Sequence, residues 1–285
     1  QAGYRVAICE QLEDPKLTKT IVQRGVTEMI TPGITENEKL LNHKSNNFLC
    51  SVFMNEEIWG TAFLDISTGE FIVSQGSDTV IEKLIHSLKP TEIIFSKSQQ
   101  KHFREIFNAS YYTYTLDDWV YQLDHSTQNL ERHFEVQTLK GFGIADMNEA
   151  VIAAGAALQY LSDTEHHQIK HINKISRIDE HDFVWMDKFT IRNLELIHAN
   201  NNSGLTLLDV MDNTVSPMGA RLLRRWVVFP LVNLLTINER LNTIEFLLNN
   251  AELQNQLQHF IKQCGDIERL VSKISNGKIS PREVV

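Results

Sequence analysis

Residues that cross-link or stiffen a chain are scarce here: 3 cysteines, 6 prolines and 13 glycines among 285 residues. Cys9, Cys50 and Cys264 are scattered and form no Cys-x-x-Cys pair, which argues against a disulfide framework or a zinc knuckle and favours a reducing cytoplasm. The low proline and glycine content excludes collagen-like and proline-rich chains. The best apolar run, 150–158, is far shorter than the about 20 residues of a membrane span, so we predict no membrane association.

The hydrophobic fraction of 42% and the charged fraction of 22% are those of a globular protein, and the length suits about two domains with part of a third. The net charge of −9 comes from residues 46–172, which hold 8 Lys and Arg against 17 Asp and Glu. A surface that grips nucleic acid needs a local excess of basic residues. We therefore predict a spacer or protein-docking module here. The start lacks both an initiator Met and a signal peptide, so we expect a longer parent protein.

The first 40 residues show a strand, helix and strand pattern. Residues 4–8 and 26–30 resemble strands, and Asp14-Pro15 is a typical helix start, with Asp as the cap and Pro in the first turn. A unit of this size cannot bury a core, so we interpret it as the tail of a domain. A polar linker, 35–47, follows.

Residues 41–172 begin as a β-meander and continue as alternating helices and strands, which predicts an α/β domain with a mixed sheet between helices. Asp65, Ser67 and Gly69 lie at a predicted turn between two strands. Asp146 and Glu149 form a predicted capping box for a last helix. The predicted strands are 48–54, 58–65, 70–74, 91–95 and 111–114, and the predicted helices are 77–88, 99–107 and 150–161.

Residues 173–285 have an all-helical pattern, which predicts a bundle or an extended lever. Asp187, Ser216-Pro217 and the pair Thr236 and Glu239 are predicted helix starts, and Asn276-Gly277 is a predicted stop. The predicted helices are 188–199, 206–211, 218–228, 236–249, 251–264 and 266–275, with a further one opening at 280.

Nucleotide and metal motifs are weak. Gly277-Lys278 lacks the other residues of a phosphate loop, and the third glycine of a dinucleotide fingerprint is missing after Gly141-Phe142-Gly143, so we predict a helix stop and a turn. The histidines 166, 167 and 171 lack a nearby cysteine and are predicted to be a solvated surface rather than a metal site. The polar run 179–182 is predicted to be a turn.

Two clusters leave alternatives open. Asp65 with Glu70 could belong to a metal-dependent nuclease, but no second acid on a strand is placed beside Asp65, so we favour a turn whose Asp65→Asn change costs about 1 kcal/mol or less. Arg221, Arg224 and Arg225 share a helix face and could contact nucleic acid, although salt bridges to a partner helix are favoured. The aromatic residues of this region are predicted core anchors: Phe183, Trp185, Phe189, Trp226, Phe229 and Phe246.

Gly219 lies inside the first turns of the predicted helix 218–228, where glycine costs about 1 kcal/mol relative to alanine. We therefore expect another backbone to approach it closely, and we expect Trp226, on the same face, to anchor this helix as a rigid joint.

Three groups of motifs together resemble the bacterial MutS mismatch-repair family, in the order and spacing of that family and over essentially the whole chain. The sequences are G-Y-R-V-A-I-C-E-Q at 3–11 and T-P-G at 31–33; D-I-S-T-G-E-F at 65–71, L-K-G-F-G at 139–143 and A-A-G at 153–155; and R-N-L-E-L at 192–196 and M-G-A-R-L-L at 218–223. The family-motif residues with a structural role are Asp65, Gly69, Gly143, Asp209, Gly219, Arg221, Trp226 and Pro230.

The resemblance implies the end of a mismatch-binding domain at 1–40, a ribonuclease-H-like connector at 41–172 and the first part of a helical lever at 173–285. It implies a parent that binds mismatched double-stranded DNA, ATP and magnesium, forms a homodimer and contacts MutL, whereas this segment couples the two activities and has no catalytic, cofactor or metal site. The Phe-x-Glu wedge of the family does not occur before Gly3. A ribonuclease-H-like nuclease and a MutS relative acting in recombination remain alternatives.

Overall fold

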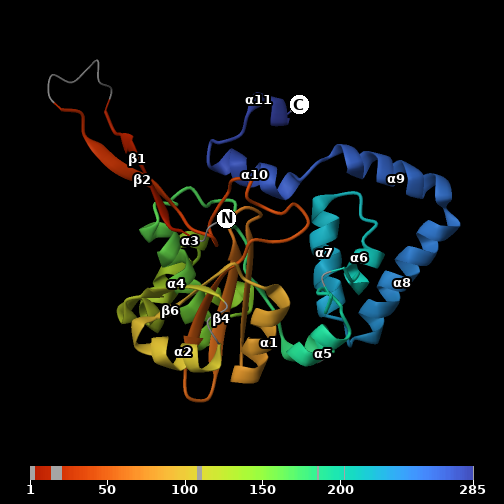
Figure 1. Cartoon of the computed structure of the whole chain (residues 1–285), viewed down its shortest axis with the longest axis horizontal. Helices are drawn as coiled ribbons and strands as arrows, with labels where there is room; N and C mark the ends of the chain where they lie inside the picture. The colour runs from red at the N-terminus through yellow and green to blue at the C-terminus, as the bar shows by residue number, and fades with distance from the viewer. Residues whose placement is uncertain (1–3, 14–20, 108–110, 185, 202, 285) are drawn as a thin grey trace.

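The computed structural model describes residues 4–13, 21–107, 111–184, 186–201 and 203–284. A small hairpin, an α/β domain and a series of helices follow one another along the chain, and the last helices return to the α/β domain (Figure 1). The predicted helix start at Asp14-Pro15 lies outside the described residues. Within the described part, no helix has both the length and the apolar character needed to cross a membrane.

A six-stranded mixed sheet forms the centre of the α/β domain, with the order β7-β6-β3-β4-β5-β8. The meander of β3, β4 and β5 is antiparallel, and β6, β7 and β8 join it in parallel. The predicted mixed sheet is confirmed. The strands are β3 (Leu49–Met54), β4 (Trp59–Asp65), β5 (Glu70–Gly76), β6 (Glu92–Ser96), β7 (Tyr112–Leu116) and β8 (Ser176–Arg177).

Helices cover both faces of this sheet and create two apolar cores. Helices α3 (Leu123–Phe134) and α4 (Asn148–Asp163) pack on one face, and α1 (Asp78–Leu88) and α2 (Gln100–Ile106) pack on the other. Helix α4 contacts α3 so closely that a Cβ at Gly155 would lie 2.4 Å from the Cα of Ser126. Glycine at this position therefore lets the two helices meet.

Two details of the α/β domain differ from prediction. Helix α3 was not predicted, because its sequence is polar on average and has few apolar positions. The predicted capping box of α4 is wrong: Met147 precedes this helix without a side-chain cap, and Glu149 Oε1 accepts a hydrogen bond from Asn55 Nδ2 at 3.3 Å. Short 3-10 helices connect the elements: η1 (Lys97–Gln99), η2 (Asp118–Tyr121), η3 (Leu139–Phe142) and η4 (Glu180–Asp182).

The N-terminal hairpin pairs β1 (Val6–Gln11) with β2 (Arg24–Ile30) in antiparallel fashion and projects from the α/β domain (Figure 1). At its base, the guanidinium of Arg5 lies 3.7 Å from the centre of the Tyr114 ring. The backbone of Met29 also donates a hydrogen bond to the carbonyl of Thr164 at 3.1 Å. The hairpin is therefore fixed to the edge of the sheet where β7 lies.

The helical segment is extended rather than a bundle. After α7, helices α8 and α9 run in an arc and bring the chain back to α10 over the α/β domain (Figure 1). Neither α8 nor α9 contains a buried residue. The helices are α5 (Lys188–Asn193), α6 (Leu207–Met211), α7 (Pro217–Val228), α8 (Leu234–Asn249), α9 (Ala251–Gln263), α10 (Ile267–Ser275) and α11 (Pro281–Val284).

Two helix boundaries also differ from prediction. Helix α5 ends at Asn193, short of the predicted residue 199, and Glu195 then takes the left-handed conformation. Helix α8 begins at Leu234, because Asn233 Oδ1 accepts hydrogen bonds from two backbone amides of its first turn. The predicted capping box of Thr236 and Glu239 is therefore wrong.

Candidate interdomain interface

Helix α7 places two arginines against the α/β domain. Ser216 caps this helix, with its Oγ accepting a hydrogen bond from the Gly219 amide at 3.2 Å, and Pro217 suits the first helical position. Arg221 follows on the buried face, and Arg225 lies one turn further along. A buried arginine needs partners for its charge, so the surroundings of Arg221 define the interface.

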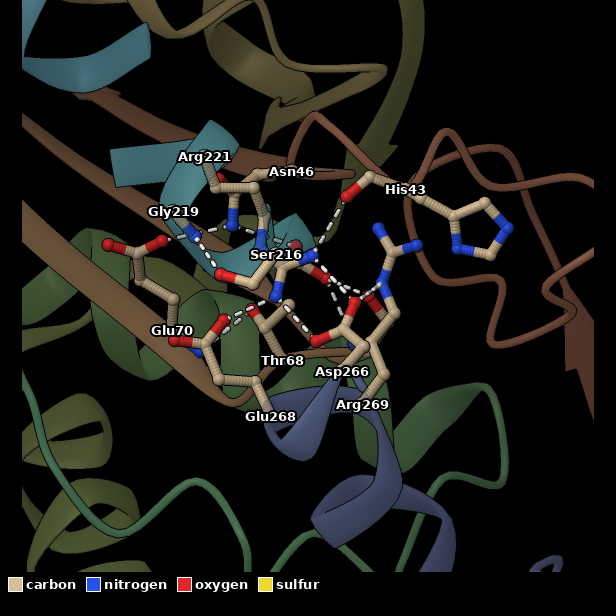
Figure 2. A network of polar contacts seen from close by, with 12 residues as sticks. His43, Asn46, Thr68, Glu70, Ser216, Gly219, Arg221, Asp266, Glu268 and Arg269 are labelled. Atoms are coloured by element: carbon tan, nitrogen blue, oxygen red, sulfur yellow. Dashed lines mark hydrogen bonds and ion pairs between the residues drawn. The ribbon is translucent and has the colours of Figure 1, made fainter. Parts of the chain in front are cut away.

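Arg221 is only 5% exposed and is enclosed by carboxylates from the start of α10 (Figure 2). Its Nη1 and Nη2 donate to the two carboxylate oxygens of Asp266 at 2.8 and 2.7 Å. Nη2 also donates to Glu268 Oε2 at 2.6 Å. Such a two-point pair fixes direction as well as charge. Helices α7 and α10, which are separated by the α8–α9 arc, are thereby bound together.

The charges in this cluster support one another. Burial acts to lower the pKa of Arg221, but hydrogen bonds to Asp266 and Glu268 outweigh it and raise that pKa. Burial acts to raise the pKa of Asp266, but Arg221 outweighs it and lowers that pKa. Both groups are therefore charged at neutral pH. Removing one partner of such a buried pair costs about 3–5 kcal/mol, because the other charge is left uncompensated.

The linker between the hairpin and the sheet is held by the same helices. Arg221 Nη1 donates to the carbonyl of His43 at 3.0 Å (Figure 2). Arg269 of α10, almost fully buried, donates through Nη2 to the carbonyls of Asn42 at 2.9 Å and Ser45 at 3.1 Å. The linker predicted from its polar composition is therefore an ordered part of the interface.

The β4–β5 turn is the part of the sheet that meets this interface. Asp65 is fully buried, and its Oδ1 accepts hydrogen bonds from the Ser67 amide at 2.9 Å and the Ser67 hydroxyl at 2.7 Å. Its Oδ2 accepts from the Asn47 amide at 3.1 Å and from Asn46 Nδ2 at 3.0 Å. Asp65 therefore stabilises the turn, as predicted, and also fixes the linker to it.

Glu70, directly after the turn, connects it to α7. Its Oε2 accepts a hydrogen bond from Asn46 Nδ2 at 2.9 Å (Figure 2). Its Oε1 accepts a hydrogen bond from Arg225. Burial raises the pKa of Glu70, and the charge of Arg225 opposes that effect. We call the set Asn46, Asp65, Glu70, Arg221, Arg225, Asp266, Glu268 and Arg269 the Arg221 junction.

The tip of the turn is also covered. Gly69 has φ of +75°, and a Cβ there would lie 3.0 Å from the carbonyl oxygen of His171, so both conformation and space require glycine. The carbonyl of Ile66 accepts hydrogen bonds from His171 Nε2 at 2.8 Å and from Ser272 Oγ of α10 at 3.0 Å. Helix α10 therefore contacts the turn directly.

A second set of contacts joins the end of α10 to the hairpin. Lys278 Nζ lies 3.0 Å from Glu28 of β2 and 3.2 Å from Glu36, and Asn276 donates to Glu36. Burial raises the pKa of Glu36, and Lys278 opposes that effect. Gly277 takes φ of +64° after α10, so Gly277-Lys278 is a helix stop, as predicted.

Glu92, which the sequence analysis did not single out, anchors the 31–33 motif. It is fully buried on β6, and its Oε1 accepts from the Tyr160 hydroxyl at 2.5 Å. Its Oε2 accepts from the Gly33 amide at 3.0 Å and from Thr31 Oγ1. The only sequence signal is an acid in an otherwise apolar strand, which does not identify its partners.

The acidic partners of Arg221 were also missed. Asp266 and Glu268 stand at the start of α10, where acids commonly offset the helix dipole, so nothing in the sequence indicates an ion pair across 45 residues. For Arg221 the favoured salt bridge to a partner helix is present. Arg225 instead pairs with strand β5.

Two expectations for α7 are wrong. The nearest atoms to a Cβ at Gly219 belong to Ser216, at 3.2 Å, and Thr214, at 3.5 Å, so no distant backbone approaches it. Trp226 is 38% exposed, and the guanidinium of Arg240 lies 3.7 Å from its ring centre, so it does not anchor the core. The Ser216 cap and the ion pairs of Arg221 and Arg225 hold α7 in place. Gly219 and Trp226 do not.

The other aromatic residues predicted as core anchors differ in their burial. Phe229 is buried, and its ring packs edge-on against Phe183 at 5.4 Å. Phe189 and Phe246 are exposed, so their prediction as core residues is wrong. Trp185 lies outside the described residues.

Other motif residues serve local structure. Asp209 forms a capping box with Thr206 at the start of α6. Gly143 ends η3 with φ of +70°, and its carbonyl accepts a hydrogen bond from Arg177 at 2.9 Å. The carbonyl of Pro230, after α7, accepts a hydrogen bond from the Val184 amide at 2.7 Å.

The predicted solvated histidine surface is only partly present. His167 is exposed, but His166 is buried against Glu28, and His171 covers the turn. Helix α4 ends at Asp163, before all three residues. In the residues that the structure describes, no group of three or more His, Cys, Asp or Glu side chains is arranged to hold a metal ion. The run 179–182 forms η4 and a turn, as predicted.

Together these contacts define a multidomain protein in which an α/β domain is joined to a hairpin and to a returning helical arm. The models of three MutS domains match this chain: domain I at residues 1–39, domain II at 47–173 and domain III at 189–285. The chain belongs to the MutS family. The domain boundaries at 40/41 and 172/173 stay predictions.

Curated relatives carry the same family name. The DNA mismatch repair protein MutS of Christiangramia forsetii is 51% identical over 284 residues, that of Flavobacterium psychrophilum is 49% identical over 285, and that of Parabacteroides distasonis is 47% identical over 285. Each match covers 100% of this chain and 33% of the relative. The chain thus spans about a third of the length of these relatives.

Proposed function

We propose that this chain is the part of a mismatch-repair protein that couples recognition of mismatched double-stranded DNA to ATP hydrolysis. In this proposal residues 1–40 end the mismatch-binding domain, 41–172 form the connector and 173–285 begin the lever. The observation that carries it is the Arg221 junction, because a single buried guanidinium bonds the linker carbonyl of His43 and both acids of α10.

The contacts support a mechanical role. A displacement of α10 relative to α7 would have to separate the buried Arg221 from Asp266, which is costly. Small movements of the arm should therefore carry the β4–β5 turn and the linker with them as one unit. The linker leads directly to the hairpin, which Lys278 also holds through Glu28. The interface thus offers a continuous physical route between the arm and the first domain.

We also propose that the connector is ribonuclease-H-like, on the order β5-β4-β3-β6-β7 of its sheet. A nuclease role is not favoured, since the named relatives are mismatch-repair proteins. In addition, both carboxylate oxygens of Asp65 already accept hydrogen bonds from the turn and the linker. A role in recombination is not favoured by those names either.

The remaining parts of the proposal concern the whole protein. We infer a cytoplasmic homodimer that binds ATP and magnesium in another domain and contacts a MutL-like protein, with no catalytic residue in this segment. The acidic balance of residues 46–172 supports protein contact rather than DNA gripping by the connector.

The test uses the full-length parent with Arg221→Met. The expected result is that ATP turnover loses most of its response to mismatched DNA, whereas nucleotide binding without DNA and mismatch binding itself remain. Coupling energies of this kind are typically about 1–3 kcal/mol, or 5- to 150-fold. Arg104→Gln, on the exposed face of α2, is the matched control. An unchanged mismatch response in the Arg221 variant would exclude the junction from coupling.

A further inference from the structure

A hollow of about 290 Å³ lies between the end of α1, the linker and α7. It is far larger than the about 30 Å³ that one water occupies. Ser87 and Lys89 from the end of α1, Asn42 and Ser45 from the linker, and Arg224 from α7 are among the residues that border it. No aspartate or glutamate is among the described residues that line it. The hollow is therefore rich in donors and cations but has no acid of its own.

Two cations of this hollow have no ion-pair partner within the described part of the chain. Arg221 and Arg225, which also border it, are bound to carboxylates of the Arg221 junction, but no ion pair includes Lys89 or Arg224. The charge that acts on Arg224 most favourably is Asp209, whose Oδ2 already accepts hydrogen bonds from Thr206. Burial, and next the charge of Arg224, lower the pKa of Lys89 to about 8. The two cations thus repel each other across a partly buried space.

A third group at this hollow is a buried hydroxyl. Ser87 is 2% exposed, and its Oγ is buried without a hydrogen-bond partner. Buried hydroxyls are nearly always bonded, so an unpaired one at the wall of a polar hollow is unusual. Lys89, two residues further on, is the left-handed C-cap of α1, with φ of +50°, and its amide donates to the carbonyl of Ile85, which fixes its backbone beside the hollow.

We propose that this hollow binds a small phosphoryl group, either inorganic phosphate or the terminal phosphate of a phosphate monoester, between Lys89, Arg224 and Ser87. A tetrahedral dianion suits two separated cations and donors on several sides, whereas one carboxylate is satisfied by a single arginine. Its binding would replace the repulsion of Lys89 and Arg224 with two attractions. It would also bridge α1 of the sheet domain to α7 of the arm.

Calorimetric titration of the chain with phosphate, at an ionic strength held constant with sodium chloride, tests this. The wild type should bind phosphate saturably at one site. Lys89→Met and Arg224→Met should each weaken the affinity about tenfold or more, and Ser87→Ala severalfold. Lys101→Met, which removes one exposed lysine from α2, should leave the affinity unchanged. Glycerol phosphate and a nucleoside monophosphate separate the sources: equal affinities indicate recognition of the phosphoryl group alone, and much tighter nucleotide binding indicates a nucleotide.

Thermal unfolding distinguishes a site from a structural role. Without phosphate, Lys89→Met should raise the melting temperature, because it removes the repulsion, while phosphate should stabilise this variant less than the wild type. Phosphate stabilises many proteins nonspecifically, and that part persists in the variants. The proposal is overturned by unsaturable heats in the wild type, or by equal phosphate affinity in the wild type and in both cation variants.

Discussion

The guanidinium of Arg221 on α7 and the carboxylate of Asp266 on α10 form a two-point ion pair, with nitrogen to oxygen distances of 2.7 and 2.8 Å. The helices that carry them are separated along the chain by the exposed arc of α8 and α9. Because α10 also contacts the β4–β5 turn through Ser272, this pair closes a ring of elements: turn, α7, arc and α10. Closure of that ring, rather than a packed bundle, gives the arm its position.

Breaking the pair on one side should be strongly destabilising. Arg221→Met removes both short hydrogen bonds to Asp266 and leaves it only the longer ion pair with Arg269 Nε at 3.8 Å, so we expect the free energy of unfolding to fall by about 3 kcal/mol in urea denaturation. Arg104→Gln should change it by less than about 0.5 kcal/mol. The double variant Arg221→Met with Asp266→Leu should recover only part of the loss, since neither partner of the two-point pair is then left charged but Arg269 loses its ion pair with Asp266. A single variant as stable as the wild type would contradict this account.

Asp65→Asn should cost more than the sequence indicates. An amide can replace only one of the two acceptor oxygens, so its NH2 group would face either the donors of Ser67 or those of Asn46 and Asn47. The loss also removes the charge of Asp65, which favours the charged form of Arg269. We expect a loss of about 2–4 kcal/mol in the free energy of unfolding. A loss below about 1 kcal/mol would restore the simpler view of a turn residue.

Two glycines of the family motifs should respond in opposite directions to alanine. Gly69→Ala forces a side chain into a left-handed conformation and against the carbonyl of His171, so we expect a loss of about 1–3 kcal/mol. Gly219→Ala lies in a helix where the nearest atom is the hydroxyl of Ser216, and we expect a change between neutral and about 1 kcal/mol of stabilisation. Melting temperatures of the two variants, measured side by side, check the contrast. A severe loss of stability in Gly219→Ala would contradict this account and support the close approach of another backbone to Gly219.

Local chemistry explains which parts of this structure were predictable. The strands within 48–76 have strong apolar patterns, and helix α7 begins with clear capping residues. These elements could therefore be predicted from the local sequence. The turn at Asp65 and Gly69 was predictable for the same reason. The end of α5 depends on the left-handed backbone conformation of Glu195, and the start of α8 depends on the cap that Asn233 provides. In both places neighbouring residues are equally good candidates for ending or starting the helix.

The interface was not predictable because its partners are distant along the chain. Arg221 pairs with residues 45 and 47 positions away, and Arg225 with one 155 positions away. Each of these acids has an ordinary local role, at a helix start or after a turn. Trp226 is the opposite case. Its large aromatic side chain predicted a core residue, but its ring lies against the guanidinium of Arg240 and not in the core.

The last prediction concerns the loss of stability at acidic pH. Burial, and then the charge of His133, lower the pKa of His171, while its hydrogen bond to the Ile66 carbonyl opposes them. In the neutral ring Nε2 donates that bond, and Nδ1 is buried without a partner, so a proton on Nδ1 would have no acceptor. The unfolded chain therefore binds this proton more readily than the folded one. The contribution of neutral His171 is complete above the unfolded pKa of about 6.5 and is lost as the pH falls through it.

We therefore expect the free energy of unfolding to fall between pH 7.5 and pH 5, with His171 contributing at most about 1.4 kcal/mol per pH unit. His171→Gln can keep a nitrogen donor for Ile66 but cannot take up a proton, so its stability curve should be flatter than that of the wild type over this range. His167→Gln is the matched control, because His167 is exposed and should leave the slope unchanged. Urea denaturation at successive pH values measures all three slopes. A slope in His171→Gln equal to that of the wild type would mean that the acid sensitivity arises at another buried histidine, such as His166, whose pKa burial also lowers.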